Sequence, residues 1–97
     1  MTPIHKAVTY LKSFKTAASL RDECRRRKVK GNRTLPYSCV LVALLRKKFS
    51  ASFCVIPGPC KRIESGDGEI VADLPDSAND FALNFDAGKY PELETDR

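Results

Sequence analysis

The side chains in this sequence that are best suited to a chemical task are clustered cations. The nine positions from Arg25 to Arg33 hold six of them: Arg25, Arg26, Arg27, Lys28, Lys30 and Arg33. Burying an isolated charge costs several kcal/mol, so we expect these groups to be solvated, paired with carboxylates or held against phosphates. Arginine suits phosphate because its planar guanidinium donates two hydrogen bonds to neighbouring oxygens. The run therefore indicates a polyanionic partner; a solvated helix end that maintains solubility is the competing interpretation.

A second basic group lies further along the chain and comprises Arg46, Lys47, Lys48, Lys61 and Arg62. Together the two groups predict binding of RNA or DNA through phosphate contacts that weaken with salt and do not read base sequence. No aromatic residue is interleaved with the first group, so base stacking there is not indicated. An acidic protein or an anionic membrane surface would meet the same charges. Residues 25–30 also resemble a nuclear-localisation signal, a match that is common by chance.

The other reactive residue types do not form a recognisable catalytic group. His5 is the single histidine, and we expect it on the polar side of an N-terminal helix. General acid–base catalysis usually needs histidine or a buried pair of carboxylates placed near a nucleophile. Cys24 lies among arginines, which would lower the pKa of its thiol, but no partner base is evident. We therefore predict no catalytic residues, no cofactor and no enzymatic activity.

The four cysteines stand at positions 24, 39, 54 and 60 and include no Cys-x-x-Cys pair. Common structural zinc sites use such pairs to place two thiolates on one tight turn, so a metal site would require tertiary convergence. Residues 1–20 lack the continuous apolar core of a secretory signal peptide, so we expect free thiols and an intracellular protein, cytoplasmic or nuclear. Their acid-free amphipathic composition is also typical of a mitochondrial transit peptide. The longest apolar run, 39–45, is too short for a transmembrane segment.

Charge is divided unevenly along the 97-residue chain. Residues 1–62 hold fifteen Lys and Arg against two acids, whereas residues 63–97 hold two against ten, within a net charge of +5. Opposite charges on one chain are at high effective concentration, so self-screening is one expectation. The other is that the two ends bind different partners. We divide the chain into a compact basic domain, 1–75, and an acidic tail, 76–97.

Hydrophobic periodicity predicts a long N-terminal helix that carries the arginines near its end. Thr2 and Pro3 are a favourable start, an N-cap hydroxyl followed by proline at the first position. Apolar residues then recur at spacings of three and four as far as Ala18. Beyond Ala18 we expect the helix to extend into solvent and to end in a left-handed cap at Gly31-Asn32. Two ion pairs at i,i+4 spacing are expected within it: Asp22/Arg26 and Glu23/Arg27.

A second helix is predicted over residues 37–49, where apolar residues again follow helical spacing from Tyr37 to Leu45. Arg46, Lys47 and Lys48 fall in its last turn, where cations interact favourably with the helix dipole. A buried strand over 38–44 is the alternative, because short apolar runs do not distinguish strands from helices.

Two short strands are predicted after this helix. Residues 50–56 alternate between two faces and stop at Pro57-Gly58-Pro59, and residues 69–74 form the second candidate. Residues 60–64 could continue in extended form. We expect the two candidates to pair as an antiparallel ribbon that packs on the helices, since an isolated ribbon is marginally stable.

The acidic tail contains one apolar element. Phe81 and Phe85 lie four residues apart and would share one side of a short helix that begins near Asp76-Ser77. This element either docks on the body as a lid or folds against a protein partner, so both residues are partner-binding candidates. Beyond Gly88 we expect fraying.

These expectations describe a small single α+β domain with an N-terminal helix, a second helix, a two-stranded ribbon and an acidic tail. The predicted function is that of a non-enzymatic accessory protein that binds nucleic acid. The predicted nucleic-acid-binding residues are Arg25, Arg26, Arg27, Lys28, Lys30, Arg33, Arg46, Lys47 and Lys48. The alternative is a protein–protein interaction subunit or adaptor of a larger assembly, in which a partner or oligomer completes a light core.

Overall fold

A computed structural model of the chain describes residues 2–33 and 39–95. Within these ranges the chain is an α+β protein, as predicted, with four α-helices and one three-stranded antiparallel sheet. The elements in chain order are α1 (Pro3–Lys12), α2 (Ala17–Arg27), α3 (Val40–Phe49), β1 (Phe53–Ile56), β2 (Arg62–Ser65), β3 (Val71–Asp73), α4 (Asp76–Asp86) and the 3-10 helix η1 (Pro91–Leu93).

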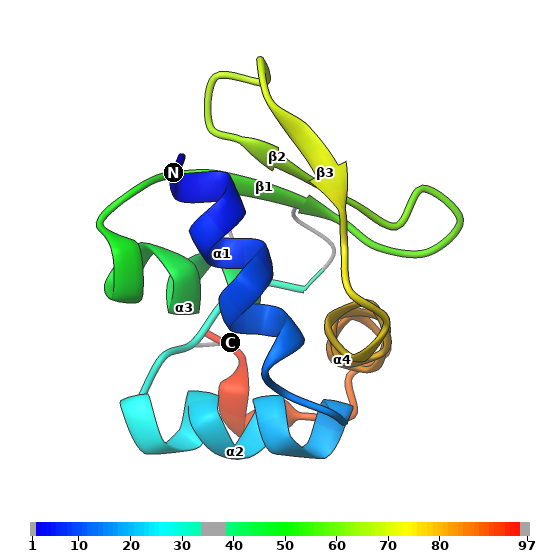
Figure 1. Ribbon diagram of the computed structural model, residues 1–97. Helices are drawn as coiled ribbons and strands as arrows, with labels where there is room; N and C mark the ends of the chain where they lie inside the picture. Colours follow the sequence, from blue (N-terminus) through cyan, green and yellow to red (C-terminus); the bar gives the residue numbers. More distant parts are fainter. Residues whose placement is uncertain (1, 34–38, 96–97) are drawn as a thin grey trace.

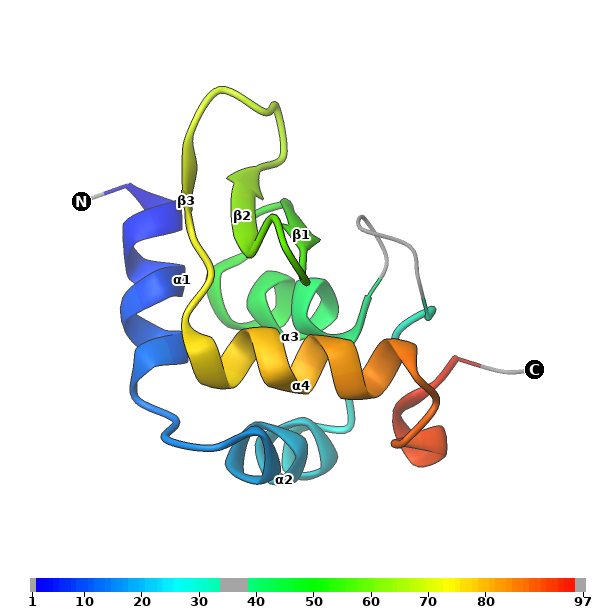
Figure 2. The same ribbon diagram turned by 90° about the vertical axis from the view of Figure 1, so that its right-hand side faces the viewer.

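The elements form layers with the sheet on one side. In Figure 1 the sheet lies above α1 and α3, while α2 runs along the bottom and α4 is seen end-on. The helix α3 packs against β1, and α1 packs against β2 and β3. Figure 2, turned by 90°, shows α4 lying lengthwise between the sheet and α2. The core is therefore enclosed by the sheet and all four α-helices.

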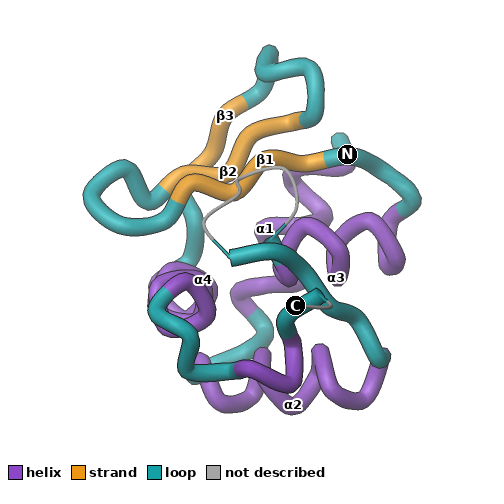
Figure 3. Tube along the Cα trace, turned by 180° about the vertical axis from the view of Figure 1, so that it is seen from behind, coloured by secondary structure: helices purple, strands orange, loops and turns teal. Residues whose placement is uncertain are grey.

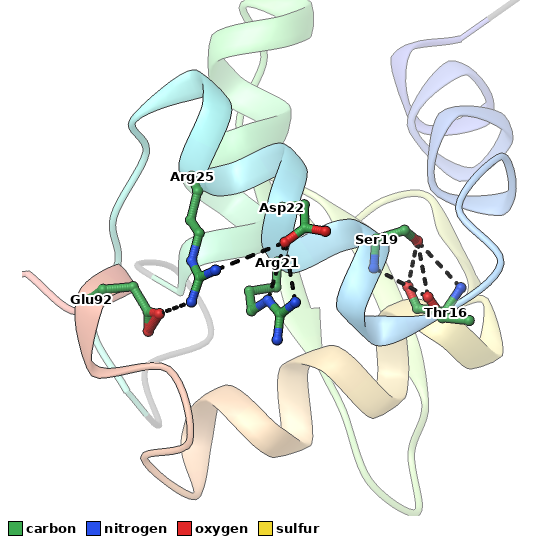
Figure 4. A network of polar contacts seen from close by, with 6 residues as sticks. All are labelled: Thr16, Ser19, Arg21, Asp22, Arg25 and Glu92. Carbon is green, nitrogen blue, oxygen red and sulfur yellow. Dashed lines mark hydrogen bonds and ion pairs between the residues drawn. The ribbon is translucent and has the colours of Figure 1, made fainter.

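The N-terminal helix begins as predicted but is shorter than predicted. Thr2 Oγ1 accepts a hydrogen bond from the His5 backbone N–H, and Pro3 occupies the first position. The helix ends at Lys12, and Thr16 starts the separate helix α2 with a capping box in which its hydroxyl accepts from Ser19 N–H (Figure 4). The prediction of one continuous helix is wrong because this Thr-x-x-Ser start signal redirects the chain. The break turns the side of α2 that carries Leu20 into the core.

The helix α2 ends earlier than the predicted cap at Gly31-Asn32. Lys28 adopts the left-handed conformation at φ 56°, and Val29 N–H donates to Cys24 O at 3.1 Å, which returns Val29 to the core. Gly31 serves packing instead, because an added Cβ would lie 2.2 Å from the backbone nitrogen of Val40. The correction shows that close approach of α3, rather than positive φ, requires glycine at position 31.

The second helix is confirmed as a helix from Val40 to Phe49, so the strand alternative does not hold there. Its predicted beginning at residue 37 lies outside the described residues. Arg46, Lys47 and Lys48 occupy the last turn, as predicted. The inner face is closely packed, since Leu41, Leu44 and Leu45 have no exposed surface.

The sheet corrects the predicted two-stranded ribbon. The strand order is β1-β2-β3, so the segment expected only to continue in extended form supplies the central strand. Val55 pairs with Ile63 and Ile63 with Ala72, which places all three on the face toward the helices. Residues 50–56 and 69–74 are consequently not neighbours. Gly58 and Gly68, in the β1–β2 and β2–β3 connections, both adopt positive φ, a conformation that glycine adopts without steric cost.

Residues 76–95 of the predicted acidic tail pack against the core, with the short helix predicted there docked on the body. Phe81 and Phe85 on α4 are fully buried, Tyr90 stacks on Phe81 with ring centroids 5.1 Å apart, and Leu93 is 2% exposed. Residues 89–95 are also held by backbone hydrogen bonds, so the expected fraying beyond Gly88 is not seen there. Thr95 N–H donates to Gly31 O at 2.8 Å. Figure 3 shows the C-terminal end of the trace beside the loop that follows α2.

Candidate polyanion-binding surface

Folding brings the first predicted basic group together with Arg46, Lys47 and Lys48 of the second. The helices α2 and α3 contact each other, and both end on the left of Figure 1, with the end of α3 above the end of α2. Lys47 Nζ on α3 donates a hydrogen bond to the backbone carbonyl of Arg27 on α2 at 2.6 Å. We refer to the resulting area as the basic surface, which comprises Arg25, Arg26, Arg27, Lys28, Lys30, Arg33, Arg46, Lys47 and Lys48.

The position of these cations has a local physical cause. The last turn of α2 holds Arg25 to Arg27, and the last turn of α3 holds Arg46 to Lys48. Unpaired carbonyls at a helix C-terminus carry partial negative charge, which favours cations there. Two such termini are adjacent, so the helix dipoles reduce the repulsion between the clustered cations. Lys47 contributes directly by capping an α2 carbonyl.

Glu23 is the centre of a polar cluster behind the arginines. Its carboxylate accepts from Arg27 Nε at 2.7 Å, from two Arg26 nitrogens at 2.9 Å each, and from the Tyr10 hydroxyl at 2.9 Å. The hydrogen bond from Arg27 is the main cause that lowers the pKa of Glu23 to about 2. Burial, together with Glu23, raises the pKa of Tyr10 to about 12. Lys48 lies 5.2 Å from the Tyr10 ring centroid, a cation–π contact on the same cluster.

The expected Glu23/Arg27 pair is therefore confirmed, whereas Asp22/Arg26 is wrong. Asp22 instead contacts its neighbour Arg21 at 3.2 Å and Arg25 at 3.9 Å. Arg26 contacts Glu23, one residue nearer than Asp22, and the same carboxylate also accepts hydrogen bonds from Tyr10 and Arg27. Both predicted pairs have the same i,i+4 spacing, so the spacing alone could not show which carboxylate Arg26 contacts.

The C-terminal segment supplies further carboxylates that sequence reasoning left out of the site. Arg25 points away from α2 toward Glu92 on η1 and forms an ion pair with it (Figure 4). Arg33 lies 4.0 Å from Glu94 and donates to the Asp86 carbonyl at 3.2 Å. The excess of acids after residue 63 was the signal for such screening. Their positions depend on the fold.

The basic surface keeps an excess of positive charge. Carboxylates of the described residues that contact its nine cations include those of Asp22, Glu23, Glu92 and Glu94. Lys28, Lys30 and Arg46 are exposed and have no hydrogen bond or ion pair from their side chains among the described residues. Positive charge with no carboxylate contact among the described residues thus lies on Lys28, Lys30 and the last turn of α3 rather than on the arginine triplet. The other predicted cations, Lys61 and Arg62, pair with Asp76 and Glu64 on the sheet side.

The remaining candidates are placed as follows. Phe81 and Phe85, predicted to bind a partner, are buried in the chain's own core and present no surface to one.

Cys24 is buried, and burial raises its thiol pKa to about 12, so the expected lowering by the arginines is wrong. All four cysteines are free thiols, with Cys60 exposed. His5 is exposed on α1, and its Nδ1 lies 2.7 Å from Thr2 Oγ1.

Comparison with known proteins returned no matching family model, no similar curated protein and no similar solved structure. Among the residues that the structure describes, His, Cys, Asp and Glu form no group suited to hold a metal ion. Over the same residues, no helix has both the length and the hydrophobicity needed to cross a membrane.

Proposed function

We propose that this protein binds RNA or DNA through phosphate contacts on the basic surface, without reading base sequence. The observation that supports the proposal is the junction of two helix C-termini, at which Lys47 on α3 contacts the Arg27 carbonyl on α2. It unites cations more than a dozen positions apart in sequence into one area with more positive than negative groups. An intracellular location with nucleic acid, cytoplasmic, nuclear or mitochondrial, is part of the proposal.

Different members of the surface have different roles in this proposal. Lys28, Lys30 and Arg46 bind phosphates first because binding breaks no existing pair. Arg26 and Arg27 are oriented by Glu23, and engaging them requires partial loss of those hydrogen bonds. The surface has no exposed aromatic ring among its nine members, so affinity would come from counterion release rather than base stacking.

The test compares two double variants that remove the same charge. Lys30→Gln/Arg46→Gln removes two unpaired cations of the basic surface. Lys12→Gln/Lys15→Gln removes two exposed cations near the other end of α2. Fluorescence anisotropy with random-sequence RNA and duplex DNA, across a salt series, gives the slope of log K against log salt. We expect the first variant to reduce the magnitude of this slope for duplex DNA by about 2 and the second to leave it nearly unchanged.

The proposal is wrong if wild-type protein binds neither nucleic acid at low salt, or if both variants weaken binding equally. Equal weakening would mean that net charge alone, rather than the basic surface, attracts the nucleic acid. Glutamine is used because it keeps a hydrogen-bonding side chain of similar length without the charge.

A protein–protein interaction subunit remains the second candidate, and exposed apolar side chains favour it. Ile70 and Val71 in the β2–β3 hairpin are 40% and 53% exposed. Ile70 and Val71 are neighbours in sequence, and contiguous exposed apolar surface marks protein interaction sites. A pull-down from native lysate with and without nuclease distinguishes the candidates. One protein retained after nuclease treatment, with no affinity for nucleic acid, would support the interaction subunit.

A further inference from the structure

A groove of about 580 Å³ lies between the end of α2 and η1, at one edge of the basic surface. It is lined by Cys24, Arg25, Lys28, Val29, Lys30, Glu92 and Leu93. Three of these residues are cations, three are apolar and one is a carboxylate. A volume of this size lies within the range of small-ligand sites, which typically combine apolar walls with a few convergent polar groups.

The backbone after α2 is what directs the cations to this groove. Lys28 is held in the left-handed conformation because the following N–H returns to Cys24 O. Val29 then enters the core and is 7% exposed, while Lys28 and Lys30 on either side of it stay in solvent. Two lysines and Arg25 therefore line the same hollow, and neither lysine has a carboxylate partner in the part of the chain that the structure describes.

Glu92 is the one anion among the described residues that line the groove, and it contacts Arg25 (Figure 4). The side chains are 39% and 49% exposed, so water and other anions reach both. Asp22 also lies near Arg25, at 3.9 Å, outside the groove lining. The hydrogen bond from Arg25 lowers the pKa of Glu92, which is therefore ionised at neutral pH.

The backbone of η1 is held independently of this ion pair. Leu93 is 2% exposed, and its carbonyl accepts from Gly31 N–H at 2.9 Å. The Glu92 side chain can consequently rotate away from Arg25 while the segment that carries it stays docked. A single side-chain rotation, which takes place within nanoseconds at exposed sites, would open the guanidinium to another anion.

We propose that this groove is a phosphate-binding subsite in which a phosphate group replaces the Glu92 carboxylate at Arg25 and gains Lys28 and Lys30. A phosphate offers more acceptor oxygens than a carboxylate, and guanidinium binds two of them in parallel. Glu92 then acts as an internal competitor that weakens binding of every outside anion. The inference rests on the proposed function, since it assigns one phosphate contact of the same surface.

The test uses backbone amide NMR of the full chain titrated with inorganic phosphate, against chloride at equal ionic strength. Phosphate should give saturable shifts at the amides of Lys28, Val29 and Lys30. Glu92→Gln should saturate at about three- to tenfold lower phosphate. The control Glu69→Gln removes the same charge from the exposed 65–70 turn and should stay within about twofold of wild type. Lys28→Asn/Lys30→Gln should abolish saturation; asparagine is chosen because it tolerates the left-handed conformation.

A second arm uses one oligonucleotide with and without a 5′-phosphate. Equal shifts in the groove would assign the phosphate to the nucleic-acid backbone, and shifts only with the 5′-phosphate would assign it to a terminal or free phosphate. Groove shifts no larger than with chloride, or equal effects of Glu92→Gln and Glu69→Gln, would overturn the inference. Oligonucleotide binding without chemical-shift changes in the groove would contradict only the phosphate subsite. Phosphate binding in the groove without any affinity for oligonucleotides would contradict only the proposed function.

Discussion

Residues 25–33 and residues 81–93 both mix charged and apolar side chains, yet the structure uses them differently. The later segment buries two phenylalanines, Tyr90 and Leu93, and places its acids outward. The earlier segment buries Val29 and holds its cations at the surface. The two meet where Arg25 contacts Glu92. The later segment is therefore part of the core because its apolar residues are large and regularly spaced, whereas the earlier segment, which buries Val29, keeps its cations at the surface.

A second contrast lies within the basic surface itself. Arg26 and Arg27 reach Glu23 from the next turn of their own helix. Lys28 and Lys30 follow the helix end, where no carboxylate lies at helical spacing. Neighbouring cations of one run thus differ in availability, because pairing within a helix stops where the helix stops.

The largest expected effect tests the structural role of the later segment. Phe81→Ala should lower the free energy of unfolding by about 3–5 kcal/mol, since it removes a fully buried ring and the Tyr90 stack. Leu83→Ala, on the exposed side of the same helix, is the control and should cost less than about 1 kcal/mol. Urea unfolding followed by circular dichroism measures both. If both substitutions lowered the free energy of unfolding equally, Phe81 would not have the buried position that the structure gives it.

An intermediate effect tests whether the arginines are held by Glu23. Glu23→Gln should destabilise the protein by about 1–3 kcal/mol at neutral pH, because hydrogen bonds to a charged acceptor are lost. The folded pKa of Glu23 is lowered from 4.5 to about 2, so its contribution is present above pH 4.5 and is lost as pH falls toward 2. Urea unfolding at several pH values should show a shallower acid dependence for Glu23→Gln than for wild type. Asp22→Asn, at a more exposed carboxylate, should change that dependence less.

The smallest expected effect separates paired from unpaired cations in binding. Lys30→Gln should lower the magnitude of the salt slope for duplex DNA by about 1, the value for one lost phosphate contact. Arg26→Gln should lower it by clearly less, because Glu23 already neutralises part of that charge. Anisotropy titrations at four or more salt concentrations have the necessary precision. If Arg26→Gln lowered the salt slope more than Lys30→Gln, the paired cations would contribute more to DNA binding than the unpaired ones.

Local features of the fold could be predicted because they depend on near neighbours in sequence. The Thr2-Pro3 start, the cationic last turn of α3 and the Glu23/Arg27 pair all involve residues within one or two helical turns. The capping box at Thr16 is equally local, but the prediction omitted it because apolar residues at helical spacing continue past it to Ala18. The error joined two helices into one.

The sequence by itself determined the α+β class, a basic run outside the core and an excess of acids near the C-terminus. Only the tertiary structure decided that β2 is the central strand, that Phe81 is core, and that Lys47 meets the end of α2. It also placed Glu92 beside Arg25, 67 positions earlier. The physical reason is that periodicity specifies which face of an element is apolar. Which other element covers that face, and which distant charges then become neighbours, depends on the packing of all elements together.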